Sequence, residues 1–148
     1  MALLGRIIVI IFAVFLASLA AGMAIAAGLL GPEWNGFTGD IGERVGFWAV
    51  TVFAVGFTGA VGLVPLVILL AVAEAYKIRS LLIYACAGAA MFALGYYGSG
   101  VPQSYDESID HAPPPISRPA ELAAAAGVVF GFIYWVIAGR KAGVWRGV

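Results

Sequence analysis

Four long apolar segments, separated by short charged or proline-rich segments, dominate this sequence of 148 residues. They cover residues 7–30, 47–73, 80–97 and 120–138. An apolar segment of about 18 or more residues can cross the ~30 Å hydrocarbon core of a membrane as a helix. The chain is 63% hydrophobic and 11% charged, whereas about 25% of the residues in soluble domains are charged. The sequence therefore predicts an integral membrane protein.

The expected fold is an all-α membrane protein, a bundle of four transmembrane helices in which residues 1–148 form one domain. A spanning segment must satisfy its own backbone groups, and only helices and closed barrels do so. Barrel strands appear as segments of about 10 residues in which apolar and polar residues alternate. The segments of this chain are continuously apolar and longer. The predicted elements are helices at about 5–30, 41–74, 79–98 and 119–139, with an extracytoplasmic loop at 99–118.

The first apolar segment also has some features of a signal peptide, with Arg6 before it and a small-residue motif at 24–26. The apolar core of a signal peptide is only about 7–15 residues long. Because residues 7–30 form a longer apolar segment, we expect an uncleaved first helix.

The charged residues predict the orientation of the bundle. One side receives most of the basic residues, namely Arg6, Lys77, Arg79, Arg140, Lys141 and Arg146, and the other receives Arg44 and Arg118. The acidic residues Glu33, Asp40, Glu43, Asp106, Glu107, Asp110 and Glu121 lie on the second side, and Glu74 lies on the first. The positive-inside rule therefore places both termini in the cytoplasm. Four spans also require both termini to lie on one side.

Local signals mark several helix boundaries. Asp40 and Glu43 have the spacing of a capping box, which predicts a second helix from about Ile41. Such a helix is longer than the membrane is thick, so it must tilt, bend or protrude, and Pro65 is the expected bend. Pro119 suits the first turn of the fourth helix. The short link at 74–79 predicts that the second and third helices are antiparallel neighbours in a helical hairpin.

Small residues recur along one face of each predicted helix and predict close helix packing. In lipid, close approach of small residues stabilises helix contacts more than the burial of apolar side chains does. These residues are Ser18, Gly22 and Ala26 in the first segment, Ala85, Ala89 and Ala93 in the third, and Ala123, Gly127 and Gly131 in the fourth. In the second segment they are Gly56, Gly59 and Gly62, with Pro65 following. The pattern leaves open whether the partner is in the same chain or another subunit.

Residues suited to chemistry are sparse. An ionisable residue deep in a membrane span suggests a functional site, but Glu74 lies at the inner end of its segment. We expect it to pair with Lys77 or with a basic residue of the C-terminal tail. His111 is the only histidine, in an acidic loop that lacks the ligand spacing of a zinc site. Cys86 is expected to be a small buried residue. No cofactor, metal site or catalytic residue is predicted.

Residues 74–80 (Glu-Ala-Tyr-Lys-Ile-Arg-Ser) and 134–143 (Tyr-Trp-Val-Ile-Ala-Gly-Arg-Lys-Ala-Gly) resemble small uncharacterised inner-membrane proteins of alphaproteobacteria. The resemblance implies a bacterial inner membrane and transfers no activity. Three better-understood classes are excluded by their chemistry. Quinone-linked disulfide oxidases need cysteine pairs, diheme cytochromes need several histidines in their helices, and small multidrug exporters need a glutamate in the first helix.

The expected function is that of a non-enzymatic accessory or structural subunit, because the helices offer packing surfaces without charged or coordinating groups. Its partners would be membrane lipids and other membrane-protein subunits or a second copy of itself. The basic inner tail, Arg140, Lys141 and Arg146, would contact anionic headgroups, and the absence of a basic face argues against nucleic acid. The alternative is a small oligomeric channel or transporter that uses the Gly/Pro-rich second helix.

Overall fold

The computed structural model describes residues 2–31, 33–34, 36–100 and 116–143. The described residues form four α-helices and one short 3-10 helix: α1 (Ala2–Leu30), α2 (Ile41–Ala75), α3 (Leu81–Gly98), α4 (Arg118–Ile137) and η1 (Gly139–Lys141). Each α-helix contains a segment long and apolar enough to cross a membrane. The prediction of an all-helical protein with four candidate spans is therefore confirmed, and each helix boundary lies within a few residues of its predicted position.

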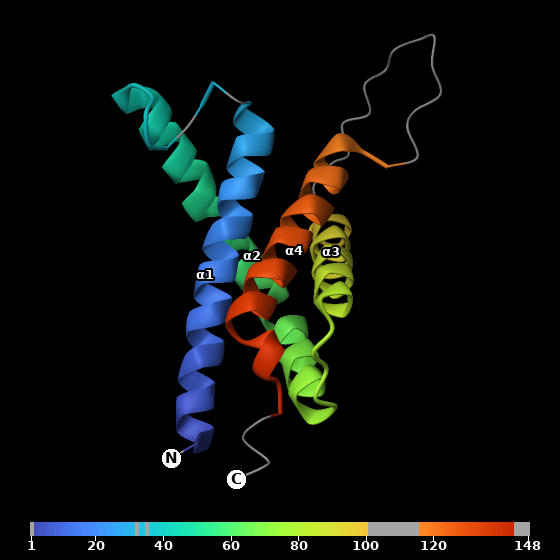
Figure 1. The fold of residues 1–148 in the computed structure, drawn as a ribbon. Coiled ribbons are helices and arrows are strands. Elements are labelled where there is room, and N and C mark those ends of the chain that lie inside the picture. The colour runs from blue at the N-terminus through green and yellow to red at the C-terminus, as the bar shows by residue number, and fades with distance from the viewer. Residues whose placement is uncertain (1, 32, 35, 101–115, 144–148) are drawn as a thin grey trace.

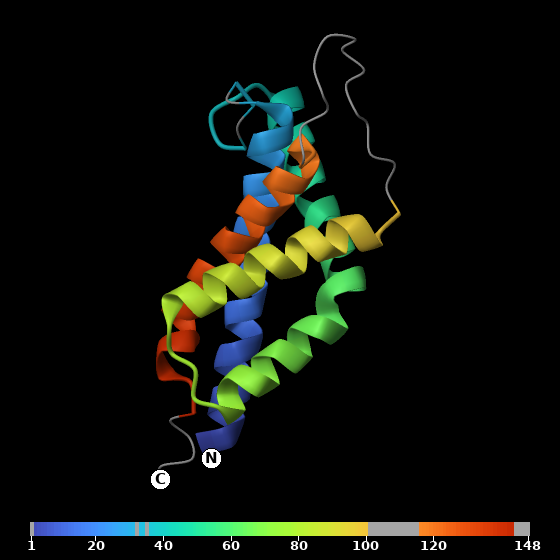
Figure 2. The same ribbon diagram turned by 90° about the vertical axis from the view of Figure 1, so that its right-hand side faces the viewer.

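Helix α4 lies at the centre of the bundle, with α1 on one side and α3 on the other (Figure 1). Helix α2 packs mainly against α1. Its contacts with α3 are sparse, and the two helices diverge from their short link (Figure 2). The predicted hairpin of α2 and α3 is therefore formed only near the link, because α3 packs its small residues against α4 instead.

The start of α2 is fixed by the capping box that the sequence predicts. The Asp40 carboxylate accepts a hydrogen bond from the Glu43 N–H at 2.9 Å, and the Asp40 N–H donates to the Glu43 carboxylate at 3.1 Å. Further along, Pro65 lies inside the helix, where it removes one backbone donor. Helix α2 changes direction along its length (Figure 2), as expected for a proline within a long helix.

We expect Asp40→Ala to lower the stability of the start of α2 by about 1 kcal/mol, because the Glu43 N–H loses its side-chain acceptor. Hydrogen exchange at the Glu43 and Arg44 amides would measure the change. Asp40→Ser restores a hydroxyl acceptor and should recover most of the protection. Equal exchange in wild type and Asp40→Ala would show that the capping box does not stabilise the helix.

The closest helix contact is between α3 and α4, where glycines bring the two backbones together. A Cβ atom on Gly88 would collide with the Gly127 carbonyl, and one on Gly131 would collide with the Tyr84 carbonyl. Beside these glycines the Phe92 and Phe130 rings lie 5.7 Å apart, and the Tyr84 and Tyr134 rings lie 5.5 Å apart. Small residues and aromatic rings thus alternate along one interface.

The bundle has two chemically different ends. The starts of α1 and of η1 lie at one end (Figure 1), together with Arg6, Lys77, Arg79, Arg140 and Lys141; we call this the basic end. At the opposite end, residues before α2 pack on its first turns. The Trp48 indole N–H donates to the Gly36 carbonyl at 3.1 Å, and the Trp34 ring packs against Gly46.

Candidate functional site

Arg6 and Glu74 form an ion pair at the basic end. The Arg6 guanidinium donates to one Glu74 carboxylate oxygen, with Nε at 3.0 Å and a second nitrogen closer still. The two side chains are only 11% and 12% exposed. The pair joins the first turns of α1 to the last turn of α2, which are far apart in the sequence.

Two backbone groups complete this arrangement, which we call the Arg6–Glu74 network. Arg6 also donates to the Ala138 carbonyl at 2.8 Å, at the end of α4. The second Glu74 oxygen accepts from the Gly143 N–H at 2.8 Å. The network therefore ties α1, α2 and the segment after α4 into one unit, and both carboxylate oxygens are engaged.

Glu74 does not form the predicted ion pair with Lys77, and Arg146 of the tail lies outside the described residues. The expectation was Lys77 or the C-terminal tail, whereas the ion pair is with Arg6. Helix α2 ends at Ala75, and Lys77 has a φ of 54°. Lys77 therefore lies outside the helical geometry that brings residues three positions apart together. Its stem packs against Gly143, whose φ is 72°.

Other basic residues at this end form contacts near the ends of α4 and η1. Arg79 donates to the Ala142 carbonyl at 3.2 Å, and its own carbonyl accepts from the Trp135 indole at 2.7 Å. Arg140 donates to the Val136 carbonyl at 3.0 Å and lies over the Trp135 ring at 5.7 Å. Lys141 is exposed in the last position of η1. These contacts hold the end of α4 against the link between α2 and α3.

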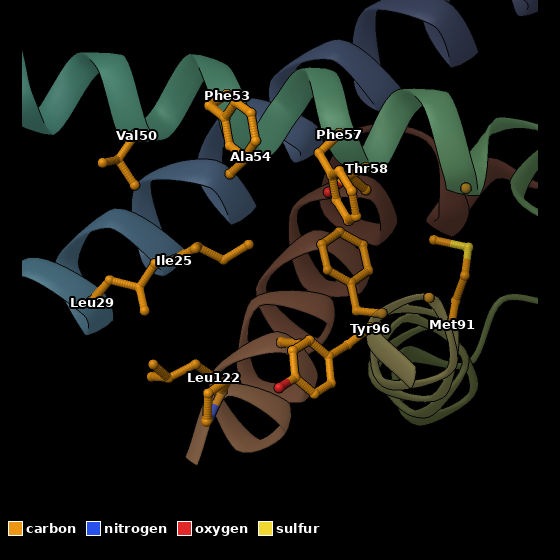
Figure 3. A pocket seen from close by; sticks show the side chains of 15 residues that line it. Ile25, Leu29, Val50, Phe53, Ala54, Phe57, Thr58, Met91, Tyr96 and Leu122 are labelled. Atoms are coloured by element: carbon orange, nitrogen blue, oxygen red, sulfur yellow. The ribbon is translucent and has the colours of Figure 1, made fainter. Parts of the chain in front are cut away.

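A second feature is an apolar pocket in the half of the bundle away from the basic end. Its volume is about 340 Å³, and all four helices line it (Figure 3). The lining residues are Ile25, Leu29, Val50, Phe53, Ala54, Phe57, Thr58, Gly62, Met91, Phe92, Gly95, Tyr96, Pro119, Leu122 and Ala123. The first half of α2 diverges from α3 and α4 at this level (Figure 1), which leaves the pocket between the helices.

Several predicted packing residues lie in contacts within the chain. Gly22 in α1 faces α2, where an added Cβ would lie 2.9 Å from the Thr51 carbonyl. Gly127 and Gly131 contact α3, and Ala26 is fully buried.

The remaining predicted residues are more open. Ser18 is half-buried and Ala123 lines the pocket. An added Cβ on Gly56 or Gly59 would meet nothing within 4 Å, and one on Gly62 would meet only Thr58 of the same helix. Pro65 is exposed. The small-residue face of α2 is thus unoccupied among the described residues.

The sequence does not predict the contacts of two residues, Gly88 and Arg6, that join helices in the structure. Gly88 makes the closest approach to α4, yet the predicted stripe on α3 ran through its alanines. The charge of Arg6 predicts the end of the bundle where it lies but not its ion pair with Glu74. Cys86 was expected to be buried and is exposed. His111 and Arg146 lie outside the described residues.

Within the described part of the chain, no group of three or more histidine, cysteine, aspartate or glutamate side chains lies close enough to hold a metal ion. Comparison with known proteins finds no protein-family model, curated protein or solved structure that matches this chain.

Proposed function

We propose that this protein is a non-enzymatic, multi-pass subunit of a bacterial inner membrane that packs against a partner membrane helix through α2. In this proposal both termini lie in the cytoplasm. The charge distribution supports that orientation, because Arg6, Lys77, Arg79, Arg140 and Lys141 gather at one end of the bundle and basic residues are retained on the cytoplasmic side.

The observation that supports this function is the open glycine face of α2. The glycines of α1, α3 and α4 that face another helix, such as Gly22, Gly88 and Gly127, are in close contact within the chain. Gly56 and Gly59 have no such neighbour. Exposed leucine or phenylalanine is ordinary on a lipid-facing helix, but a glycine face leaves a furrow that a second helix fills better than lipid does.

The Arg6–Glu74 network favours a structural role for the charged residues. A carboxylate that couples proton movement to transport lies near the middle of the membrane and beside a cavity. Glu74 instead lies in the last turn of α2, and its two oxygens accept hydrogen bonds from Arg6 and from the Gly143 N–H.

We expect Gly59→Leu to abolish assembly with the partner while leaving the bundle folded. The added side chain has open space within the chain, so it blocks only a helix that approaches from outside. Native mass spectrometry of protein extracted in a mild detergent would compare the complexes of variant and wild type.

Gly5→Leu is the matched control, because Gly5 also has open space around it but lies near the start of α1. Gly5→Leu should assemble like wild type. If both variants assemble normally, the α2 face is not the interface. A single protomer that passes a small solute in vesicles, and loses this flux in Gly59→Leu, would instead support the channel alternative.

A further inference from the structure

From the exposed arginines at the basic end, we infer that the protein binds one anionic phospholipid, with the phosphate held by the guanidinium groups of Arg79 and Arg140 beside the Trp135 ring. This inference rests on the membrane placement in the proposed function. It goes beyond that function because the site lies between the end of α4 and the link that precedes α3, and not on the glycine face of α2. It also differs from a general attraction of basic residues to headgroups, because it requires two arginines in fixed positions.

Contacts around Trp135 hold the two arginines near each other. The Trp135 indole N–H donates to the Arg79 carbonyl at 2.7 Å, and the Arg140 guanidinium lies over the Trp135 ring, 5.7 Å from its centroid. Both side chains are also anchored at Nε. That atom of Arg79 donates to the Ala142 carbonyl at 3.2 Å, and that of Arg140 donates to the Val136 carbonyl at 3.0 Å. The two guanidinium groups are therefore positioned by the same segment at the end of α4.

The terminal nitrogens of both guanidinium groups remain available to a ligand. Within the described part of the chain, Arg79 and Arg140 each donate a side-chain hydrogen bond only through Nε, and both residues are exposed. A guanidinium presents its N–H donors in a planar fork that fits two oxygens of a phosphate. Because the Nε atoms are already fixed, less conformational freedom is lost when the terminal nitrogens bind.

The local charge favours an anion at this position. Glu74 is the only acidic residue that the structure describes at the basic end, and Arg6 pairs with it. Both Glu74 oxygens accept hydrogen bonds, and its side chain is nearly buried. Lys77, whose stem packs against Gly143, adds a third exposed cation from the link between α2 and α3. A basic site of this kind between helices on the cytoplasmic side suits an anionic headgroup.

An exposed apolar face of α4 leads to the arginines and suits the acyl chains. Val128 and Phe132 are 43% and 46% exposed, and Trp135 is partly exposed. Their spacing of four and then three residues places all three on one face of α4, and tryptophan favours the headgroup level of a membrane. A ligand at this site therefore has an anionic group beside Trp135 and hydrocarbon along α4. A phospholipid has this shape, whereas a free phosphate lacks the apolar part.

Native mass spectrometry of the full chain in a mild detergent tests this inference by measuring lipid binding. The probes are phosphatidylglycerol, phosphatidylcholine with the same acyl chains, and glycerol phosphate without acyl chains. We expect phosphatidylglycerol to bind about tenfold more tightly than phosphatidylcholine, whose choline cation offsets the charge of the phosphate. Excess glycerol phosphate should not displace phosphatidylglycerol, because it lacks the hydrocarbon that contacts α4.

A variant that preserves charge separates the arginine site from general attraction. Arg79→Lys combined with Arg140→Lys keeps both charges but removes both forks, so phosphatidylglycerol should bind about tenfold more weakly. The matched control is Lys141→Gln, which removes a charge from an exposed residue at the same end. It should weaken binding by no more than about fivefold, the effect of one charge near the membrane surface.

Arg140→Lys alone keeps the inference testable if the double variant fails to fold. The one described hydrogen bond of the Arg140 side chain is to the end of its own helix, so this variant should fold like wild type and bind phosphatidylglycerol about threefold more weakly. Unfolding in SDS without added lipid checks the fold of each variant.

Equal binding of the two lipids, or wild-type binding in the charge-preserving variants, would overturn the arginine site. A larger loss in Lys141→Gln than in the double variant would also overturn it, in favour of general attraction. Displacement by glycerol phosphate would overturn the assignment to a lipid. Gly59→Leu should bind phosphatidylglycerol like wild type, so normal assembly of that variant with lipid binding intact would count against the proposed function and not against the lipid site.

Discussion

Replacing Gly127 with alanine should destabilise the bundle by about 3 kcal/mol or more, at the upper end of what overpacking costs. The added methyl group would collide with the Gly88 carbonyl and lie 2.8 Å from the Ala89 nitrogen. These are backbone atoms of α3, so no side-chain rotation relieves the collision and the two helices must move apart. Unfolding in mixed micelles with increasing SDS, followed by circular dichroism, measures the change.

Gly95→Ala is the control for this prediction. Gly95 is also a glycine of the α3–α4 pair, but an added Cβ there meets nothing within 4 Å. The substitution should leave stability unchanged or raise it by about 0.5–1 kcal/mol, because alanine favours a helix over glycine. Similar losses in Gly127→Ala and Gly95→Ala would mean that the close approach of α3 and α4 does not hold the bundle together.

The sequence predicts which residues of α4 contact α3, but it does not predict which face of α3 contacts α4. Gly127 and Gly131 stand out because they are the only small residues between positions 127 and 137, where all the others are bulky. In α3 nearly every second residue is small, so several faces satisfy the same pattern and Gly88 cannot be distinguished from Ala89. The choice of face depends on α4, which is distant in the sequence.

The four spans are predictable because hydrophobicity and length decide them locally. The arrangement of α2 and α3 is not. A short link brings two helix ends together, but whether the helices then pack depends on what each meets further along. Here α3 finds the glycines of α4, and α2 bears Pro65 and packs on α1. The pocket that results from this divergence has no local signal in the sequence.

The partner of Glu74 in the Arg6–Glu74 network is also not predictable from the local sequence. The charge distribution places Arg6 and Glu74 at the same end of the bundle, which the structure agrees with. Pairing rules for one helix favour Lys77 as the partner, but α2 ends before Lys77. Choosing Arg6 requires the knowledge that α1 and α2 are adjacent, and their contact is set by Gly22, Thr51 and Val55.

Arg6→Gln should destabilise the bundle by about 3 kcal/mol, because removing one member of a nearly buried ion pair leaves the other charge uncompensated. Glu74 would keep its hydrogen bond from the Gly143 N–H, but one carboxylate oxygen would lose the guanidinium in a site where the side chain is only 12% exposed. The Ala138 carbonyl would lose its contact with Arg6 as well. SDS unfolding of the variant measures the loss.

A double-mutant cycle isolates the contribution of the pair. Arg6→Gln with Glu74→Gln removes both charges, and the amide that replaces the Glu74 carboxylate still offers an oxygen to the Gly143 N–H. The double variant should therefore be more stable than the sum of the single losses predicts, with a coupling of about 1–3 kcal/mol. Lys141→Gln is the matched control: Lys141 is exposed in the last position of η1 at the same end of the bundle, so its loss should stay within about 0.5 kcal/mol. Additive losses in the cycle would show that Arg6 and Glu74 act independently and that hydrophobic packing alone joins α1 to the end of α2.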